Sequence, residues 1–233
     1  MMNLGFLSYL LACITVLNTF LWYLYPMDIT AVMLASISSY SAWFLYFWIQ
    51  AEKNFNVADK ITLSRWILFT TSALVAILLK DSNWWVLIGV SLAVALDGLD
   101  GWMARKLQIA SEYGRILDME VDHMTTSLLV AISVMIIGIS PWLLCLNLLR
   151  PLYLLFGKQK LQEKEYRSQA HLLRAKVICI LSQILLIINL APIFSLETKE
   201  FLSLINLILL SYSFTVDLWL EHRHHKLETL TNH

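Results

Sequence analysis

Long apolar runs, each close to the length of a membrane-crossing helix, constrain this chain more than any other feature. A helix needs about 20 mostly apolar residues to cross a hydrocarbon core about 30 Å thick. Runs of this kind occupy most of the 233 residues, of which 58% are hydrophobic and only 15% charged. Soluble domains carry about 25% charged residues. The sequence therefore predicts a multi-pass integral membrane protein.

The runs predict an all-α fold with about eight transmembrane helices. A backbone in lipid must satisfy its own hydrogen bonds, and the runs lack the alternating pattern of a membrane β-strand. The expected spans are 4–25, 29–50, 61–80, 84–105, 118–140, 141–157, 171–193 and 200–220.

The distribution of basic residues predicts the orientation in the membrane. Lysine and arginine accumulate in the cytoplasmic loops of membrane proteins. With eight spans, one side carries only Lys80 and Lys199, whereas nearly all other basic residues fall on the opposite side. We therefore expect both termini to face the cytoplasm, and the cytoplasmic membrane as the location if the source is bacterial or archaeal. The net charge of zero argues against a nucleic-acid partner.

Half of the chain's aspartates lie in the window 97–122, at the predicted cytoplasmic ends of the fourth and fifth spans. An ionisable group at membrane depth costs about 2.5–3.5 kcal/mol on insertion scales, so such groups need partners. Asp97 and Asp100 are three residues apart, and Asp118 and Asp122 are four apart, so each pair shares one helix face. Two antiparallel helices would bring these faces together.

These four aspartates predict a divalent-metal site. Carboxylates in one cavity repel one another unless cations are present, and two divalent ions would neutralise four of them. Oxygen ligands alone favour Mg²⁺, Mn²⁺ or Ca²⁺ over zinc. The alternatives are a network of interhelical salt bridges and a proton relay in a transporter. The counter-charge near the aspartates is small, with Arg105 on the same helix face and Arg115 near the loop, whereas salt bridges would need nearly as many basic partners as acids.

The same window resembles the signature of the CDP-alcohol phosphatidyltransferase family. A segment before the third span is similar to the family's N-x-x-T-x-x-R, with Asp59 in place of Asn and with Thr62 and Arg65 matching. The resemblance covers about residues 55–220, which implies a six-helix core in 55–233 preceded by two additional helices in 1–54. The family pattern D-x2-D-G-x2-A-R-x8-G-x3-D-x3-D is matched at every specified position, by Asp97, Asp100, Gly101, Ala104, Arg105, Gly114, Asp118 and Asp122.

The resemblance implies an enzyme of phospholipid synthesis. Such an enzyme transfers a phosphatidyl group from a CDP-linked lipid to an alcohol and releases CMP, with an active site on the cytoplasmic side. The resemblance also implies two divalent ions, Mg²⁺ or Mn²⁺, held by the four aspartates, with Asp122 as ligand and general base. Homodimers are usual among proteins resembling this family. The implied CDP contacts are Gly101, Arg105, Ser111, Thr62 and Arg65.

Three basic residues favour an acceptor that itself carries phosphate. Arg150 lies inside the sixth span. An arginine at membrane depth is energetically costly, so it is a candidate functional residue. Arg174 and Lys176 open the seventh span in H-L-L-R-A-K, which is similar to a segment of phosphatidylglycerophosphate synthases. Snorkelling at the lipid headgroups is the alternative for these two. We therefore expect CDP-diacylglycerol as donor and a small phosphorylated alcohol such as glycerol 3-phosphate as acceptor, bound by these three residues.

Other activities are consistent with part of this pattern. Within the family, they are transfer from a CDP-amino-alcohol to diacylglycerol, and phosphatidyl transfer to serine, choline or inositol-type acceptors. A membrane prenyltransferase also uses aspartates, Mg²⁺ and a pyrophosphate, but carries its acidic pairs on distant helices. A transporter would show repeated halves with broken helices near mid-membrane, and no repeat is visible here.

Overall fold

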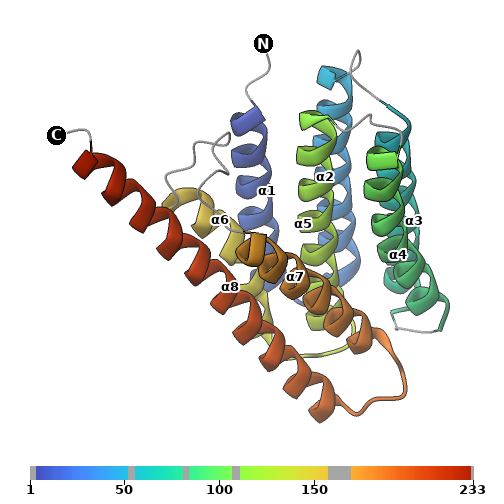
Figure 1. The fold of residues 1–233 in the computed structure, drawn as a ribbon. Coiled ribbons are helices and arrows are strands. Elements are labelled where there is room, and N and C mark those ends of the chain that lie inside the picture. Colours follow the sequence, from blue (N-terminus) through green and yellow to red (C-terminus); the bar gives the residue numbers. More distant parts are fainter. Residues whose placement is uncertain (1–3, 52–55, 81–83, 107–110, 157–168, 232–233) are drawn as a thin grey trace.

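A computed structural model describes residues 4–51, 56–80, 84–106, 111–156 and 169–231, and within these residues it contains helices and no strands (Figure 1). Each predicted span contains a helix, which confirms the all-α prediction. In chain order the helices are α1 (Leu4–Leu24), α2 (Ile29–Ala51), α3 (Val57–Leu79), α4 (Trp84–Lys106), α5 (Glu112–Met135), the 3-10 helix η1 (Pro141–Cys145), α6 (Leu146–Phe156), α7 (Gln169–Leu190) and α8 (Leu196–Thr231).

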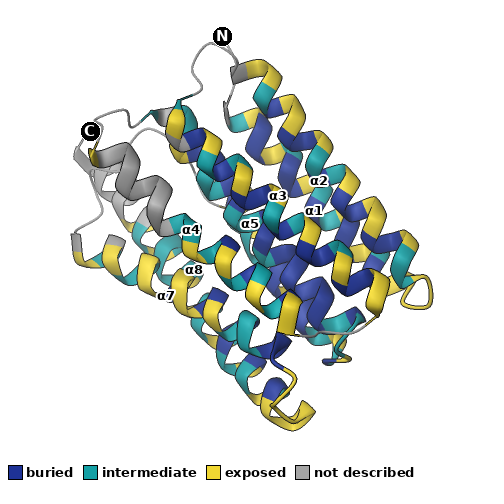
Figure 2. Ribbon diagram, turned by 90° about the vertical axis from the view of Figure 1, so that its right-hand side faces the viewer, coloured by how far each residue is buried: buried dark blue, intermediate teal, exposed yellow. Residues whose placement is uncertain are grey.

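The helices have the length and surface of a membrane protein. Five of them, α1, α2, α3, α7 and α8, are long and apolar enough to cross a membrane. Shorter apolar stretches lie in α4, over Trp84–Asp97, and in η1 with α6, over Pro141–Phe156. Large hydrophobic side chains are exposed on the outward faces of the helices, where a soluble protein would be polar (Figure 2). The chain is a multi-pass integral membrane protein.

Several helix bounds differ from the predicted spans, for local reasons. α5 begins at Glu112, ahead of its apolar part, because the Ser111 side chain caps the helix by accepting a hydrogen bond from Gly114 N at 2.9 Å. The sixth span starts as a 3-10 turn with Pro141 at its first position, and only then becomes α-helical. α8 continues to Thr231, beyond its apolar residues, because a helix can extend past the hydrocarbon core of the membrane.

α5 lies at the centre of the bundle, where it contacts α1, α2, α3, α6 and α7. α7 and α8 run obliquely to the other long helices and contact each other (Figure 1). α1 begins and α8 ends at the same end of the bundle (Figure 1), as an even number of crossings requires. The acidic residues of α5 therefore lie within reach of several neighbouring helices.

α3 and α4 pack closely because Gly89 has no side chain. A Cβ atom at this position would overlap the Ser72 hydroxyl of α3. The two helices form an antiparallel pair whose close contact brings the end of α4 next to the start of α3 (Figure 1). This packing positions Asp97 of α4 beside Arg65 of α3.

Candidate active site

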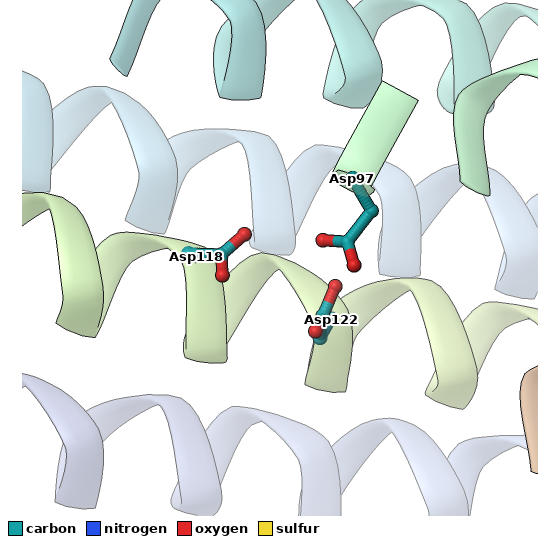
Figure 3. Close-up of side chains that lie close together, drawn as sticks. All are labelled: Asp97, Asp118 and Asp122. Atoms are coloured by element: carbon teal, nitrogen blue, oxygen red, sulfur yellow. The ribbon is translucent and has the colours of Figure 1, made fainter. Parts of the chain in front are cut away.

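Three of the four predicted metal ligands converge between α4 and α5. Asp97, Asp118 and Asp122 each offer a carboxylate oxygen, and these oxygens lie within 4.8 Å of one another. Figure 3 shows the three side chains pointing toward a common space, Asp97 from one helix and Asp118 and Asp122 from successive turns of the next. The prediction that these two helix faces meet is confirmed for the three residues. Asp100, Gly101 and Arg105 lie on α4, but their side chains are outside the described part of the chain.

Arg65 of α3 contacts all three carboxylates. Its Nη1 lies 2.6 Å from Asp97 Oδ1 and 2.8 Å from Asp118 Oδ1, and its Nη2 lies 2.7 Å from Asp122 Oδ1. The Arg65 side chain is only 4% exposed, whereas the aspartates are partly open to solvent. From the sequence, Arg65 is expected to contact the nucleotide, and its role as a counter-charge for the cluster was missed because it lies on a different helix far from the window. Its contact with CDP stays a prediction.

The cluster fits a divalent cation. Three carboxylates against one guanidinium leave two negative charges uncompensated when all three are ionised. Asp97 Oδ1 is buried and pairs with Arg65 Nη1 without a well-aligned hydrogen bond in the described part of the chain, so this oxygen is not fully satisfied by protein donors. A set of carboxylate oxygens is the donor type that Mg²⁺ and Mn²⁺ prefer.

The start of α3 is locked against the start of α5. Asn56 caps α3 by accepting from Asp59 N at 3.2 Å, and the Asp59 side chain accepts from Asn56 N at 2.8 Å, which is a complete capping box. The Asp59 carboxylate is buried against Gly114, where a Cβ atom would lie 2.6 Å from Asp59 Oδ1. The capping box and the contact with Gly114 therefore give the Asp59 carboxylate a structural role at the position where the family motif has Asn. The contact also keeps Arg65, two turns further along α3, in register with α5.

Thr62 and Ser111, the other two CDP contacts predicted near this region, lie in the described part of the chain. Thr62 is buried on α3, one turn from Arg65. The Ser111 hydroxyl forms the N-cap of α5, so its clearest role in the structure is to start the helix that carries Asp118 and Asp122. Their contacts with the nucleotide stay predictions.

A second ionic contact lies on another face of α5 and was missed in the sequence analysis. Glu120 is fully buried, and its Oε1 lies 2.5 Å from Arg150 Nη2 of α6 and accepts from Ser8 Oγ of α1 at 2.6 Å. The signal was visible, since Glu120 is an acid within the window and Arg150 is an arginine in a span. Glu120 lies two residues from both Asp118 and Asp122, which places it off their helix face.

A cavity of about 150 Å³ is lined by both Asp122 of the acidic cluster and Arg150. It lies between α5, α6, α7 and α8, and its polar lining includes Asp122, His123, Arg150 and Ser182. The Ser182 hydroxyl is buried and has no hydrogen-bond partner among the described residues. The cavity therefore offers a carboxylate at one side, a guanidinium at another, and an unsatisfied hydroxyl between helices. Its complete lining is Met119, Asp122, His123, Thr126, Leu146, Arg150, Cys179, Ser182, Leu210 and Phe214.

The other two basic residues expected to bind the acceptor, Arg174 and Lys176, lie on α7 and do not line this cavity. Arg174 Nη2 donates to Asp217 Oδ1 of α8 at 2.5 Å, and its guanidinium lies 5.8 Å from the centre of the Tyr212 ring. Two other guanidinium nitrogens of Arg174, Nε and Nη1, are buried without a hydrogen-bond partner in the described structure. Lys176 is exposed. The structure thus separates Arg150, which lines the cavity with Asp122, from Arg174, which joins α7 to α8.

A membrane-embedded helical bundle with a carboxylate cluster beside a small cavity, mostly apolar but containing an arginine and an aspartate, is suited to an enzyme that handles charged substrates at a lipid surface. The chain belongs to the CDP-alcohol phosphatidyltransferase family, whose model matches residues 55–221. No curated protein and no solved structure matched the chain. The matched segment contains α3 to α7 and most of α8, whereas α1 and α2 precede it.

Family membership establishes the class of reaction. Proteins of this family are transferases of phospholipid biosynthesis that act on substituted phosphate groups and move a phosphatidyl group from a CDP-alcohol to an alcohol acceptor. They typically use a divalent metal, for which Asp97, Asp118 and Asp122 form a suitable cluster. The match favours this chemistry over the prenyltransferase and transporter alternatives.

Proposed function

We propose that the protein transfers the phosphatidyl group of CDP-diacylglycerol to a small phosphorylated alcohol, with glycerol 3-phosphate as the leading acceptor. The observation that carries this proposal is the cavity that contains both Asp122 and Arg150. A guanidinium is well matched to a phosphate group because it combines positive charge with several planar N–H donors. An acceptor whose phosphate contacts Arg150 would have its hydroxyl directed toward Asp122.

The reaction requires one proton to move and replaces one phosphoanhydride bond with a phosphate ester bond. The acceptor hydroxyl oxygen bonds to the phosphatidyl phosphorus, the bond from that phosphorus to the CMP oxygen breaks, and the hydroxyl proton passes to the Asp122 carboxylate. Asp122 lines the cavity, and its Oδ1 accepts from Arg65 Nη2 at 2.7 Å, which fixes the orientation of the carboxylate. General base catalysis of this kind contributes about 10²–10⁴-fold to the rate.

The charge on the donor requires cations at the same place. Asp97, Asp100, Asp118 and Asp122 would hold two divalent ions, Mg²⁺ or Mn²⁺, which neutralise charge on the attacking and leaving oxygens. The nucleotide would contact Gly101, Arg105, Ser111, Thr62 and Arg65. Arg174 and Lys176 would attract the anionic acceptor toward the cavity from the α7 side.

The cytoplasmic side of the membrane is the proposed location of this site, because basic residues gather in the loops on that side. A homodimer, as the family resemblance implies, stays a prediction.

The experiment is to measure CMP release from CDP-diacylglycerol by the full-length protein in lipid vesicles with Mg²⁺ or Mn²⁺. The acceptor panel contains glycerol 3-phosphate, inositol phosphate, inositol, serine and choline, and a second series pairs a CDP-amino-alcohol with diacylglycerol. We expect release that depends on a phosphorylated acceptor and stops with EDTA. Release with an unphosphorylated acceptor, or only from the CDP-amino-alcohol, would overturn the proposed substrates, and release unaffected by EDTA would overturn the metal site.

A further inference from the structure

The first helix, which precedes the family domain, contacts His123, which lines the cavity, and Glu120, the ionic partner of Arg150. α1 packs against both α5 and α6, and α2 packs against α5. Among the buried residues of α1 are four polar ones, and polar groups buried at membrane depth are usually paired with other groups. These residues are Ser8, Thr15, Asn18 and Thr19.

Ser8 acts on Arg150 through Glu120. The Ser8 hydroxyl and Arg150 Nη2 both contact the same oxygen of Glu120, at 2.6 and 2.5 Å. A fully buried carboxylate that loses one of its donors attracts the remaining guanidinium more strongly. The Ser8 hydroxyl therefore shares the charge of Glu120 and leaves more of the Arg150 charge for a ligand in the cavity.

Thr15 makes the second contact, two helical turns further along the same face of α1. Its Oγ1 lies 3.2 Å from His123 Nε2 and also donates to Leu11 O at 3.0 Å. A hydroxyl has a single proton, so a Thr15 that donates to Leu11 O can only accept from His123. The contact sets the ring orientation of His123, which lines the cavity beside Asp122.

We propose that α1, which lies outside the family domain, is part of the acceptor site, with Ser8 and Thr15 as positioning residues for Arg150 and His123. This gives α1 a role in acceptor binding. The inference rests on the proposed function of Arg150 as an acceptor contact. It names residues of α1 that touch no substrate and act through side chains of α5 and α6.

The test compares Ser8→Ala with Thr19→Val in the full-length protein in lipid vesicles. Thr19 is the matched control because, among the described residues, its buried hydroxyl bonds only to the Thr15 carbonyl of the same helix, at 2.8 Å. Loss of a hydrogen bond to a charged group lowers a binding constant by about tenfold. We expect Ser8→Ala to raise the acceptor KM about tenfold, with the donor KM unchanged, and Ser8→Thr to restore it. An acceptor KM in Ser8→Ala equal to that of Thr19→Val would overturn the proposal.

A double-mutant cycle separates this inference from the proposed function. If Ser8 acts through Arg150, the effects of Ser8→Ala and Arg150→Lys are not additive. The same four proteins are compared by their resistance to unfolding, which needs no turnover. Additive effects on both acceptor KM and unfolding refute the role of α1. A wild-type protein that releases no CMP with any acceptor refutes the proposed function, and the stability cycle then still decides whether Ser8 and Arg150 are coupled.

Discussion

Removal of Arg65 is the most informative single change, because one buried guanidinium contacts three carboxylates. In Arg65→Ala the carboxylates of Asp97, Asp118 and Asp122 keep their places but lose this counter-charge. Two unit charges 4.8 Å apart repel by about 3.5 kcal/mol at an effective dielectric constant of about 20. The aspartates are 23–42% exposed, so solvent screens part of this repulsion. Removing one member of a buried ion pair costs about 3–5 kcal/mol, and we expect a loss near the lower value.

The assay is unfolding by SDS in mixed micelles, followed by tryptophan fluorescence. Trp66, the residue after Arg65, is buried and reports on packing next to the site. In EDTA we expect Arg65→Ala to unfold at clearly lower SDS than wild type, and millimolar Mg²⁺ to restore most of the difference, since a divalent ion supplies the missing positive charge. Arg115→Ala is the matched control, because Arg115 is an exposed arginine on α5.

Two results would refute this reasoning. If Arg65→Ala and Arg115→Ala are equally stable in EDTA, the three ion pairs do not hold the carboxylates together. If Arg65→Ala is destabilised but Mg²⁺ has no effect, the cluster does not bind the cation in the way its charge and oxygen ligands indicate. Arg65→Lys should be intermediate in both conditions, because one ammonium cannot contact three carboxylates with the geometry of a guanidinium.

Three further changes test other parts of the site. Asp122→Asn should lower kcat for CMP release by about 10²–10⁴-fold with little change in unfolding, since it removes the base and keeps the shape; near-normal turnover would exclude the proposed base. Gly114→Ala should destabilise the protein by about 1–3 kcal/mol, because the new Cβ would press on Asp59; SDS unfolding measures this, and an unchanged midpoint would mean that α3 and α5 separate easily. Asp217→Asn should weaken the contact of α7 with α8 by removing the ionic partner of Arg174; proteolysis between these helices checks it, and unchanged cleavage would show the pair to be dispensable.

The helices and the acidic cluster could be predicted from the sequence because both follow from short-range rules. Hydrophobic runs of sufficient length mark the spans, and spacings of three and four residues place aspartates on one helix face. Asp97, Asp118 and Asp122 converge as this spacing predicts. The start of α5 was placed too late because a capped, polar first turn carries no hydrophobic signal, although Ser111 with Gly114 is a recognisable helix start.

The contacts that hold the site could not be predicted in the same way. Arg65 reaches the cluster from another helix, and its position depends on the close packing at Gly89 and Gly114. No spacing rule relates residues on helices whose contacts are unknown. The link between Ser8 and Glu120 spans 112 residues of sequence and joins a helix outside the family domain to one inside it. Ser8 and Thr15, seven residues apart on one face of α1, were a usable signal for a polar contact, but their partners could not be predicted.

α5 shows why these contacts matter together. The helix carries polar groups on two faces, with Asp118 and Asp122 toward α3 and α4, and Glu120 and His123 toward α1 and α6. Such a helix is not apolar enough to be stable in lipid alone, so each face needs partners from neighbouring helices. On one side, Arg65 supplies positive charge. On the other side, Arg150 supplies positive charge, and Ser8 and Thr15 each supply a hydroxyl group. The partners that stabilise α5 in the membrane therefore also hold its reactive side chains in position. Changes in α1 and α3 should consequently affect catalysis as well as folding.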